Sequence, residues 1–171
     1  MRRIAAIGAG VAMALGLVLS APNDVEAQEL HVGGQASYGT EDFSELGVGV
    51  RGTYLLTDVI AGAADFNYHF PGEGLTFWDL NINGHYHFDL NGGVTPYAGA
   101  GINYSNLSVD LDFGEFGDFG SASTSEVGIN VLGGVFTDLD NGVRLYGEGR
   151  FVISDADQLV LTVGAGFPLG G

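Results

Sequence analysis

From Gln28 onward, every second residue of this chain is apolar or small through eight successive segments, and none of these positions carries a charge. Side chains alternate between the two faces of a β-strand, so this period of two predicts strands with one uncharged face and argues against helices. The uncharged positions run from Leu30 to Tyr38, Leu46 to Leu56, Ile60 to Phe70, Trp78 to Phe88, Val94 to Tyr104, Ser125 to Val135, Val143 to Ile153 and Leu159 to Phe167. Ser125 is their one polar side chain.

The intervening positions are small, polar or charged, and the fourth segment is the most polar. It carries Asp79, Asn81, Asn83, His85 and His87 on this second face. The two faces of the predicted sheet therefore differ sharply in chemistry.

The N-terminus has the features of an export signal. Arg2 and Arg3 precede an apolar run that ends near Leu19, and Val25-Glu26-Ala27 forms a small-residue cleavage site. We expect residues 1–27 to be a cleavable signal peptide and residues 28–171 to form one barrel domain. The chain has no cysteine, which excludes disulfides and a lipid-anchored N-terminal cysteine.

The expected exported chain is strongly acidic. Of the five basic and twenty-one acidic residues, Arg2, Arg3, Asp24 and Glu26 fall in the signal, leaving three arginines, no lysine and a net charge of −16. Phosphate binding needs a basic surface, so nucleic acid is excluded as a partner. A saline habitat, attraction of divalent cations and loops that resist aggregation all remain possible reasons for this acidity.

The connections between segments alternate in length. Residues 57–58, 89–93 and 137–142 read as tight turns, whereas 39–45, 71–77 and 105–123 read as longer loops, with 154–158 a short exception. Long loops at one rim, and turns with both chain ends at the other, are typical of bacterial outer-membrane barrels, whose strands need about ten residues to cross the bilayer. We expect an eight-stranded antiparallel up-and-down transmembrane β-barrel with periplasmic termini.

A soluble lipocalin-like barrel is the alternative, with the apolar face turned inward. Aromatic residues favour the membrane, because two aromatic girdles around an aliphatic band are expected at bilayer interfaces. Those toward the loop rim are Tyr38, Tyr68, Phe70, Trp78, Tyr104 and Phe151. Those toward the turn rim are Tyr54, Tyr86, Phe88 and Phe167.

Two motifs resemble the small eight-stranded outer-membrane β-barrel family of the OmpA membrane-domain, OmpX and OmpW kind, over residues 28–171. Residues 94–101, Val-Thr-Pro-Tyr-Ala-Gly-Ala-Gly, are similar to a family strand that Tyr104 completes, and Phe167 is similar to its terminal aromatic. The chain departs from the family by continuing through Gly171. The resemblance implies contact with outer-membrane lipid and lipopolysaccharide, and insertion by the barrel assembly machinery.

All three arginines of the expected exported chain fall on the inward face. Arg51, Asp65, Glu148 and Arg150 lie mid-strand, so we expect these four to form a charge network at one level of the lumen. The interior of an eight-stranded barrel just accommodates its own side chains, which favours a plug over a gated ion path.

No inward cluster carries a recognisable catalytic or metal motif. His69, His85, His87 and Asp79 lack an evident further ligand, so we expect satisfied lumen histidines and no metal or cofactor. Ser105, Ser108 and His69 are loose candidates for catalysis without a motif, and we expect no enzyme activity.

The third long loop is the least generic segment. Its candidate partner-binding residues are Asp110, Asp112, Phe113, Phe116 and Phe119. The acids match the EF-hand order poorly. The loop is interpreted as a solvated strand extension with its Phe residues over the barrel mouth; alternatively these Phe residues meet a surface partner or guard a pocket for a small apolar molecule.

The sequence thus predicts a monomeric outer-membrane barrel with a structural or surface-interaction role. Passage or binding of a small molecule, including a hydrophobic one, is the main alternative. A lipid-modifying outer-membrane enzyme comes third, and a soluble binder fourth.

Overall fold

The computed structural model describes residues 29–40, 45–71, 75–88, 90, 92–112 and 118–169, so the predicted signal peptide lies outside the described residues. The described segments form eight strands: β1 (Leu30–Thr40), β2 (Glu45–Leu55), β3 (Ile60–His69), β4 (Leu75–His87), β5 (Thr95–Asp112), β6 (Asp118–Asp138), β7 (Arg144–Ile153) and β8 (Gln158–Leu169). Within these residues, no helix is long and apolar enough to cross a membrane.

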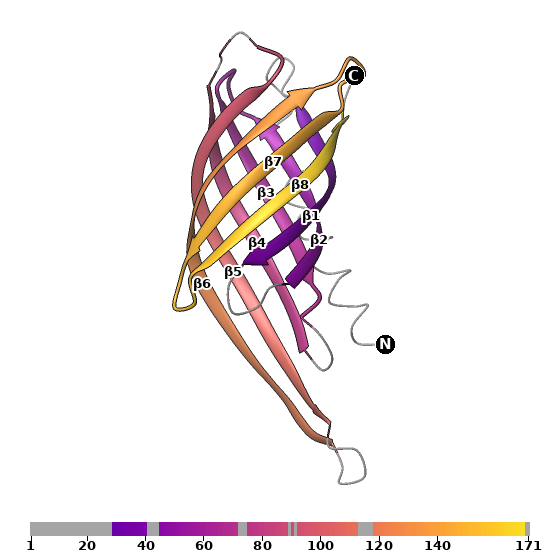
Figure 1. Cartoon of the computed structure of the whole chain (residues 1–171), viewed down its shortest axis with the longest axis vertical. Coiled ribbons are helices and arrows are strands. Elements are labelled where there is room, and N and C mark those ends of the chain that lie inside the picture. The colour runs from indigo at the N-terminus through magenta and orange to yellow at the C-terminus, as the bar shows by residue number, and fades with distance from the viewer. Residues whose placement is uncertain are drawn as a thin grey trace.

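The strands close into one barrel in sequence order (Figure 1). Each strand pairs antiparallel with the next, and β1 closes the sheet against β8, from Leu30 opposite Leu169 to Thr40 opposite Leu159. The predicted eight-stranded antiparallel barrel is confirmed.

Short turns connect the strands at one rim. Between β2 and β3, the Leu56 amide donates to the Ile60 carbonyl (2.8 Å) and Thr57 Oγ1 accepts from the Ile60 amide (3.0 Å). Between β6 and β7, Gly142 has a φ of 78°, a left-handed conformation that favours glycine. The start of β1 and the end of β8 lie at this same rim.

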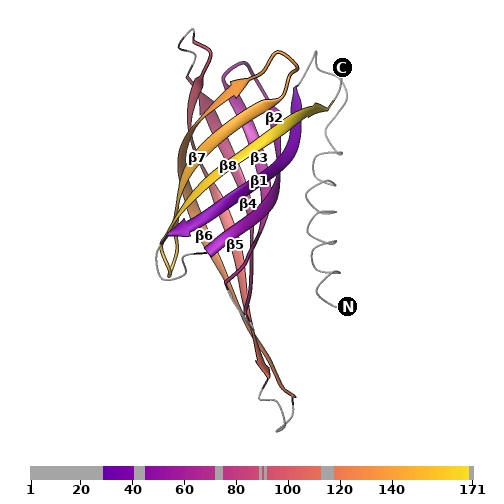
Figure 2. The ribbon, with the colours of Figure 1, turned by 45° about the vertical axis from the view of Figure 1, so that its right-hand side comes forward.

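β5 and β6 continue as a hairpin beyond the rest of the barrel (Figures 1 and 2). They have 18 and 21 residues, whereas the other strands have 10 to 13. Residues 105–112 and 118–123, which the connection lengths marked as part of a long loop, are strand, in agreement with the interpretation of this loop as a strand extension. Asn106 donates to Ser125 Oγ (2.9 Å) across the hairpin, on the face that is apolar within the barrel. On β5 the apolar positions change face, because Leu107 and Val109 lie on the side that is polar within the barrel, while residues 122–126 of β6 are small or polar on both sides.

The barrel is apolar outside and polar inside. Ile82, Ile102 and Ile129 form an outward row across β4, β5 and β6, with exposed fractions of 45%, 57% and 57%. On the inward face, Arg51 is 4% exposed and Asp65 is fully buried. The exposed surface is therefore unsuited to water, and the buried interior must satisfy its polar groups internally.

Candidate functional site: the closed lumen and its mouth

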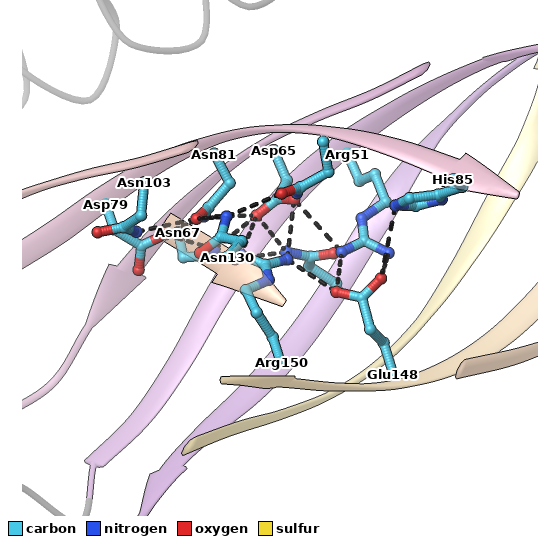
Figure 3. A network of polar contacts seen from close by, with 12 residues as sticks. Arg51, Asp65, Asn67, Asp79, Asn81, His85, Asn103, Asn130, Glu148 and Arg150 are labelled. Atoms are coloured by element: carbon cyan, nitrogen blue, oxygen red, sulfur yellow. Dashed lines mark hydrogen bonds and ion pairs between the residues drawn. The ribbon is translucent and has the colours of Figure 1, made fainter. Parts of the chain in front are cut away.

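Glu148 on β7 is the acceptor at the centre of the lumen (Figure 3). Arg51 donates to both its carboxylate oxygens, at 3.0 Å from Nη1 and 2.8 Å from Nη2, and Arg150 Nη2 donates at 2.9 Å. The Tyr97 hydroxyl adds a fourth bond at 2.9 Å. Buried charges are tolerable when paired and hydrogen-bonded in this way.

Asp65 on β3 is the second carboxylate of this cluster. Arg150 donates to it from Nη1 (3.3 Å) and Nη2 (3.0 Å), and Arg51 Nη2 lies 3.3 Å from Oδ2. Each arginine thus bonds both acids. The structure brings together Arg51, Asp65, Glu148 and Arg150, the four residues that the sequence placed at one level; we call them the lumen network.

Asp79 on β4 extends this arrangement toward the loop rim. The Asn67 amide donates to both Asp65 Oδ1 and Asp79 Oδ1, at 2.9 Å each, and the Asn81 amide also donates to both carboxylates. His69 Nε2 donates to Asp79 Oδ2 at 2.5 Å. Asp79 was considered from the sequence as a possible metal ligand, and its link to Asp65 was not predicted. The inward asparagines on β3 and β4 were the available signal.

Two tyrosines contact the lumen network, and the ring of each lies over a glycine of a neighbouring strand. The ring of Tyr97 lies over Gly134, where an added Cβ would be 2.6 Å from its hydroxyl oxygen. Tyr146 lies over Gly164 in the same way, and its hydroxyl donates to Gln35 Oε1 (2.8 Å). Glycine at these inward positions makes room for the tyrosine rings.

The lumen network separates two cavities. A cavity of about 370 Å³ at the loop rim has Arg150 and Asp79 in its wall; we call it the mouth cavity. A cavity of about 20 Å³ on the other side has Arg51, His85 and Tyr97 in its wall. The cluster of paired charges therefore fills the bore between them.

Glu126 orders the short β7–β8 loop beside the mouth cavity. Its Oε1 accepts from the backbone amides of Asp155 (2.5 Å) and Ala156 (3.2 Å), while Asp157 Oδ1 accepts from the Ser154 amide (3.1 Å). At the opposite rim, Arg144 forms a two-point bond with Asp138, at 2.7 and 2.8 Å. Glu126 and Arg144 therefore lie toward opposite rims of the barrel.

The lumen histidines are held by different neighbours. His85 stacks on Tyr97 with ring centroids 4.8 Å apart, and His87 meets Phe136 edge to face at 4.9 Å. Among the described residues, no group of three or more His, Asp or Glu side chains is arranged to hold a metal ion.

The candidate catalytic residues do not form a catalytic arrangement. Ser105 lies opposite Asp79 on β5, and Ser108 donates to Asn106 (3.2 Å). In the described part of the chain, no hydrogen bond joins either serine to His69.

The predicted girdle residues lie on the outward face. Trp78 is flanked by Phe66 and Tyr104, with ring centroids 5.9 and 5.7 Å away, and Tyr68 meets Phe70 at 5.4 Å. Strand pairing places Tyr38 and Phe151 within two or three residues of the loop-rim ends of β1 and β7. Near the turn rim, Tyr86 meets Phe88 at 5.1 Å, while Tyr54 and Phe167 lie close to the ends of β2 and β8.

The predicted partner-binding residues of the third loop lie largely beyond the description. Phe113 and Phe116 are outside the described residues. Asp110 and Asp112 belong to β5 and Phe119 to β6, but their side chains are not described.

Comparison with solved structures finds the same barrel fold in several bacterial proteins. Neisserial surface protein A has 17% identity and a TM-score of 0.60, with 81% of this chain and 94% of that chain covered. The N-terminal β-barrel domain of Pseudomonas aeruginosa OprF has 16% identity and a TM-score of 0.63, over 84% and 100%. Ail, the attachment invasion locus protein of Yersinia pestis, has 15% identity and a TM-score of 0.60, over 83% and 97%.

No curated protein sequence matches the chain. A family model described as "Opacity family porin protein" matches residues 63–158, more than half of the chain. This match covers most of β3 through the start of β8, including three of the four residues of the lumen network. The resemblance to small eight-stranded outer-membrane barrels is confirmed, and the chain belongs to the Opacity family of porin proteins.

Proposed function

We propose that this barrel serves at the cell surface as a non-catalytic, monomeric interaction protein whose lumen is closed by side chains. The β5–β6 hairpin carries the proposal, because its strands continue to Asp112 and Asp118, well beyond the loop rim of the other strands. Loops and hairpins at that rim face the outside in outer-membrane barrels, with the termini in the periplasm. Residues 1–27 act as the signal peptide, and residues 28–171 form the barrel domain.

The β6 edge supports a role in contact with other molecules. β6 pairs with β7 from Ile129 onward, so within the described residues the stretch 118–128 has no strand partner on that side. Unpaired backbone donors and acceptors on an edge strand are available to another chain.

The lumen network makes passage the weaker proposal. Two arginines and two carboxylates, each less than 5% exposed, occupy the bore between the two cavities. An eight-stranded barrel has little internal width beyond what such side chains fill. We also propose that outer-membrane lipid surrounds the barrel. Phe167 on β8, which is 54% exposed, is the residue that we expect the assembly machinery to recognise.

The charge distribution selects the kind of partner. Arg51, Arg144 and Arg150 are 3–8% exposed inside the barrel, and no lysine occurs in the chain. Ail has been solved with the heparin analogue sucrose octasulfate. The acidic surface of this chain fits a basic partner instead, because like charges repel a polyanion.

The test uses the full barrel in lipid nanodiscs on surfaces coated with heparin or with histone. We expect binding to histone that weakens as salt rises, and none to heparin. Replacing residues 110–121 with Asn-Gly joins Val109 to its partner Ala122 and should reduce histone binding.

Two further variants separate charge from apolar contact at the hairpin tip. One neutralises Asp110, Asp112, Glu115 and Asp118, and the other changes Phe113, Phe116 and Phe119 to serine. Loss of histone binding in the first variant indicates that charge drives binding. Loss of histone binding in the second indicates that apolar contact drives it. Heparin binding, or histone binding unchanged by the deletion, would refute the proposal.

A further inference from the structure

The wall of the mouth cavity contains both apolar and acidic side chains. Phe77, Leu107, Val152 and Val160 supply apolar surface. The acids in its wall are Glu45, Asp79, Glu126, Asp155 and Asp157. Among the described lining residues, Arg150 is the single arginine or lysine, and Asp65 and Glu148 already accept its hydrogen bonds.

Among the described acids of this wall, Glu45 is the one with a buried carboxylate oxygen that accepts no hydrogen bond. It lies at the start of β2, on the inward face that Arg51 shares, and is 5% exposed. Its Oε2 is buried and has no hydrogen-bond partner within the described structure. Asp79 and Glu126, in contrast, accept bonds from Asn67, His69 and the loop backbone. A buried carboxylate oxygen without a donor is unfavourable, and a bound cation would relieve this cost.

We propose that the mouth cavity binds an organic ammonium ion with an apolar body, with Glu45 accepting from the ammonium group. The cavity volume of about 370 Å³ accommodates such a molecule, and Phe77 and Leu107 offer surface to its apolar part. The acids are too dispersed for a bare metal ion, since no described group of three or more acids or histidines is arranged to hold one. The site is independent of the hairpin tip, so it can succeed or fail separately from the surface role.

The test titrates three probes that share one body into the full barrel in lipid nanodiscs, with empty nanodiscs as the blank for partitioning. 2-Phenylethylamine carries a positive charge, 2-phenylethanol is neutral and phenylacetate is negative. We expect saturable one-to-one heat from the amine alone, and no saturable heat from calcium chloride.

The variants locate the site. Glu45→Gln should weaken binding of the amine about tenfold, the effect of losing one charged hydrogen bond. Leu107→Ala should weaken it about fivefold through lost apolar contact. Glu29→Gln makes the same chemical change at the turn rim and should leave binding unchanged. A heat-induced gel shift checks that each variant forms a closed barrel.

Three results would overturn the proposal. The first is alcohol binding as tight as that of the amine. The second is an equal effect of Glu45→Gln and Glu29→Gln, which would indicate general surface potential. The third is stoichiometric calcium binding that the amine displaces, which would indicate a metal site.

Discussion

Glu148→Ala should lower the free energy of unfolding of the barrel by about 3–5 kcal/mol, the range found when one partner of a buried ion pair is removed. The substitution leaves Arg51 and Arg150 with Asp65 as their remaining shared acid, and it removes the acceptor of the Tyr97 hydroxyl. Urea unfolding in lipid vesicles, followed by the gel mobility of the folded barrel, measures the change.

Asp138→Ala is the control, because Asp138 also bonds an arginine at two points but its side chain is 44% exposed. Its loss should cost less than the loss of Glu148, because Asp138 is half-exposed at the rim and leaves one arginine unpaired, whereas Glu148 serves two buried arginines. The double variant Arg51→Gln with Glu148→Gln keeps the Arg150–Asp65 pair balanced, and should be more stable than Glu148→Ala. A Glu148→Ala effect no larger than the Asp138→Ala effect would show that the lumen network does not hold the barrel together.

Ile102→Arg should destabilise the barrel in a bilayer by about 2–4 kcal/mol, the cost of an arginine facing lipid near the midplane. Ile102 is 57% exposed and lies between Ile82 and Ile129 in the outward row. Were this face in water, an exposed arginine there would be neutral or stabilising. Unfolding in vesicles gives the sign as well as the size of the effect.

Val94→Arg is the matched control near the turn rim, where Val94 is 52% exposed just before β5. Near the interface the cost should fall to about 0–1 kcal/mol. Equal effects at positions 94 and 102 would contradict the depth dependence that a bilayer imposes.

The sequence predicted the strands well wherever one face is apolar and the other face lines the packed lumen. The same alternation placed Arg51, Asp65, Glu148 and Arg150 on the inward face, because a period of two assigns every side chain to one side. Because all four lie near the middle of their strands, the sequence also predicted that they lie at a similar height in the lumen. The alternation and the position along each strand were therefore sufficient to predict that these four residues lie together.

The hairpin could not be read in the same way. Asn106, Ser108 and Ser125 occupy the face that is apolar within the barrel. Beyond the barrel the apolar positions of β5 change to the other face, at Leu107 and Val109, and residues 122–126 of β6 are small or polar on both faces, although the pairing continues. Alternation therefore underestimates strands that leave the membrane.

The wider polar network depends on how far each side chain extends across the lumen, which the alternation of apolar and polar residues does not specify. Asn67 and Asn81 each bridge Asp65 and Asp79, and Tyr97 reaches Glu148 over Gly134. These contacts depend on strand tilt and side-chain rotamers across several strands. The sequence identified these residues as inward-facing but could not identify their partners.

Trp78 offers the most direct test that lipid contacts the uncharged outer face. It is the single tryptophan of the chain and lies outside the barrel between Phe66 and Tyr104. In vesicles of brominated phosphatidylcholine, we predict strong quenching of its fluorescence, greatest with bromine near the headgroup end of the acyl chain, and little quenching by aqueous iodide. Full quenching by iodide with no effect of brominated lipid would contradict the account.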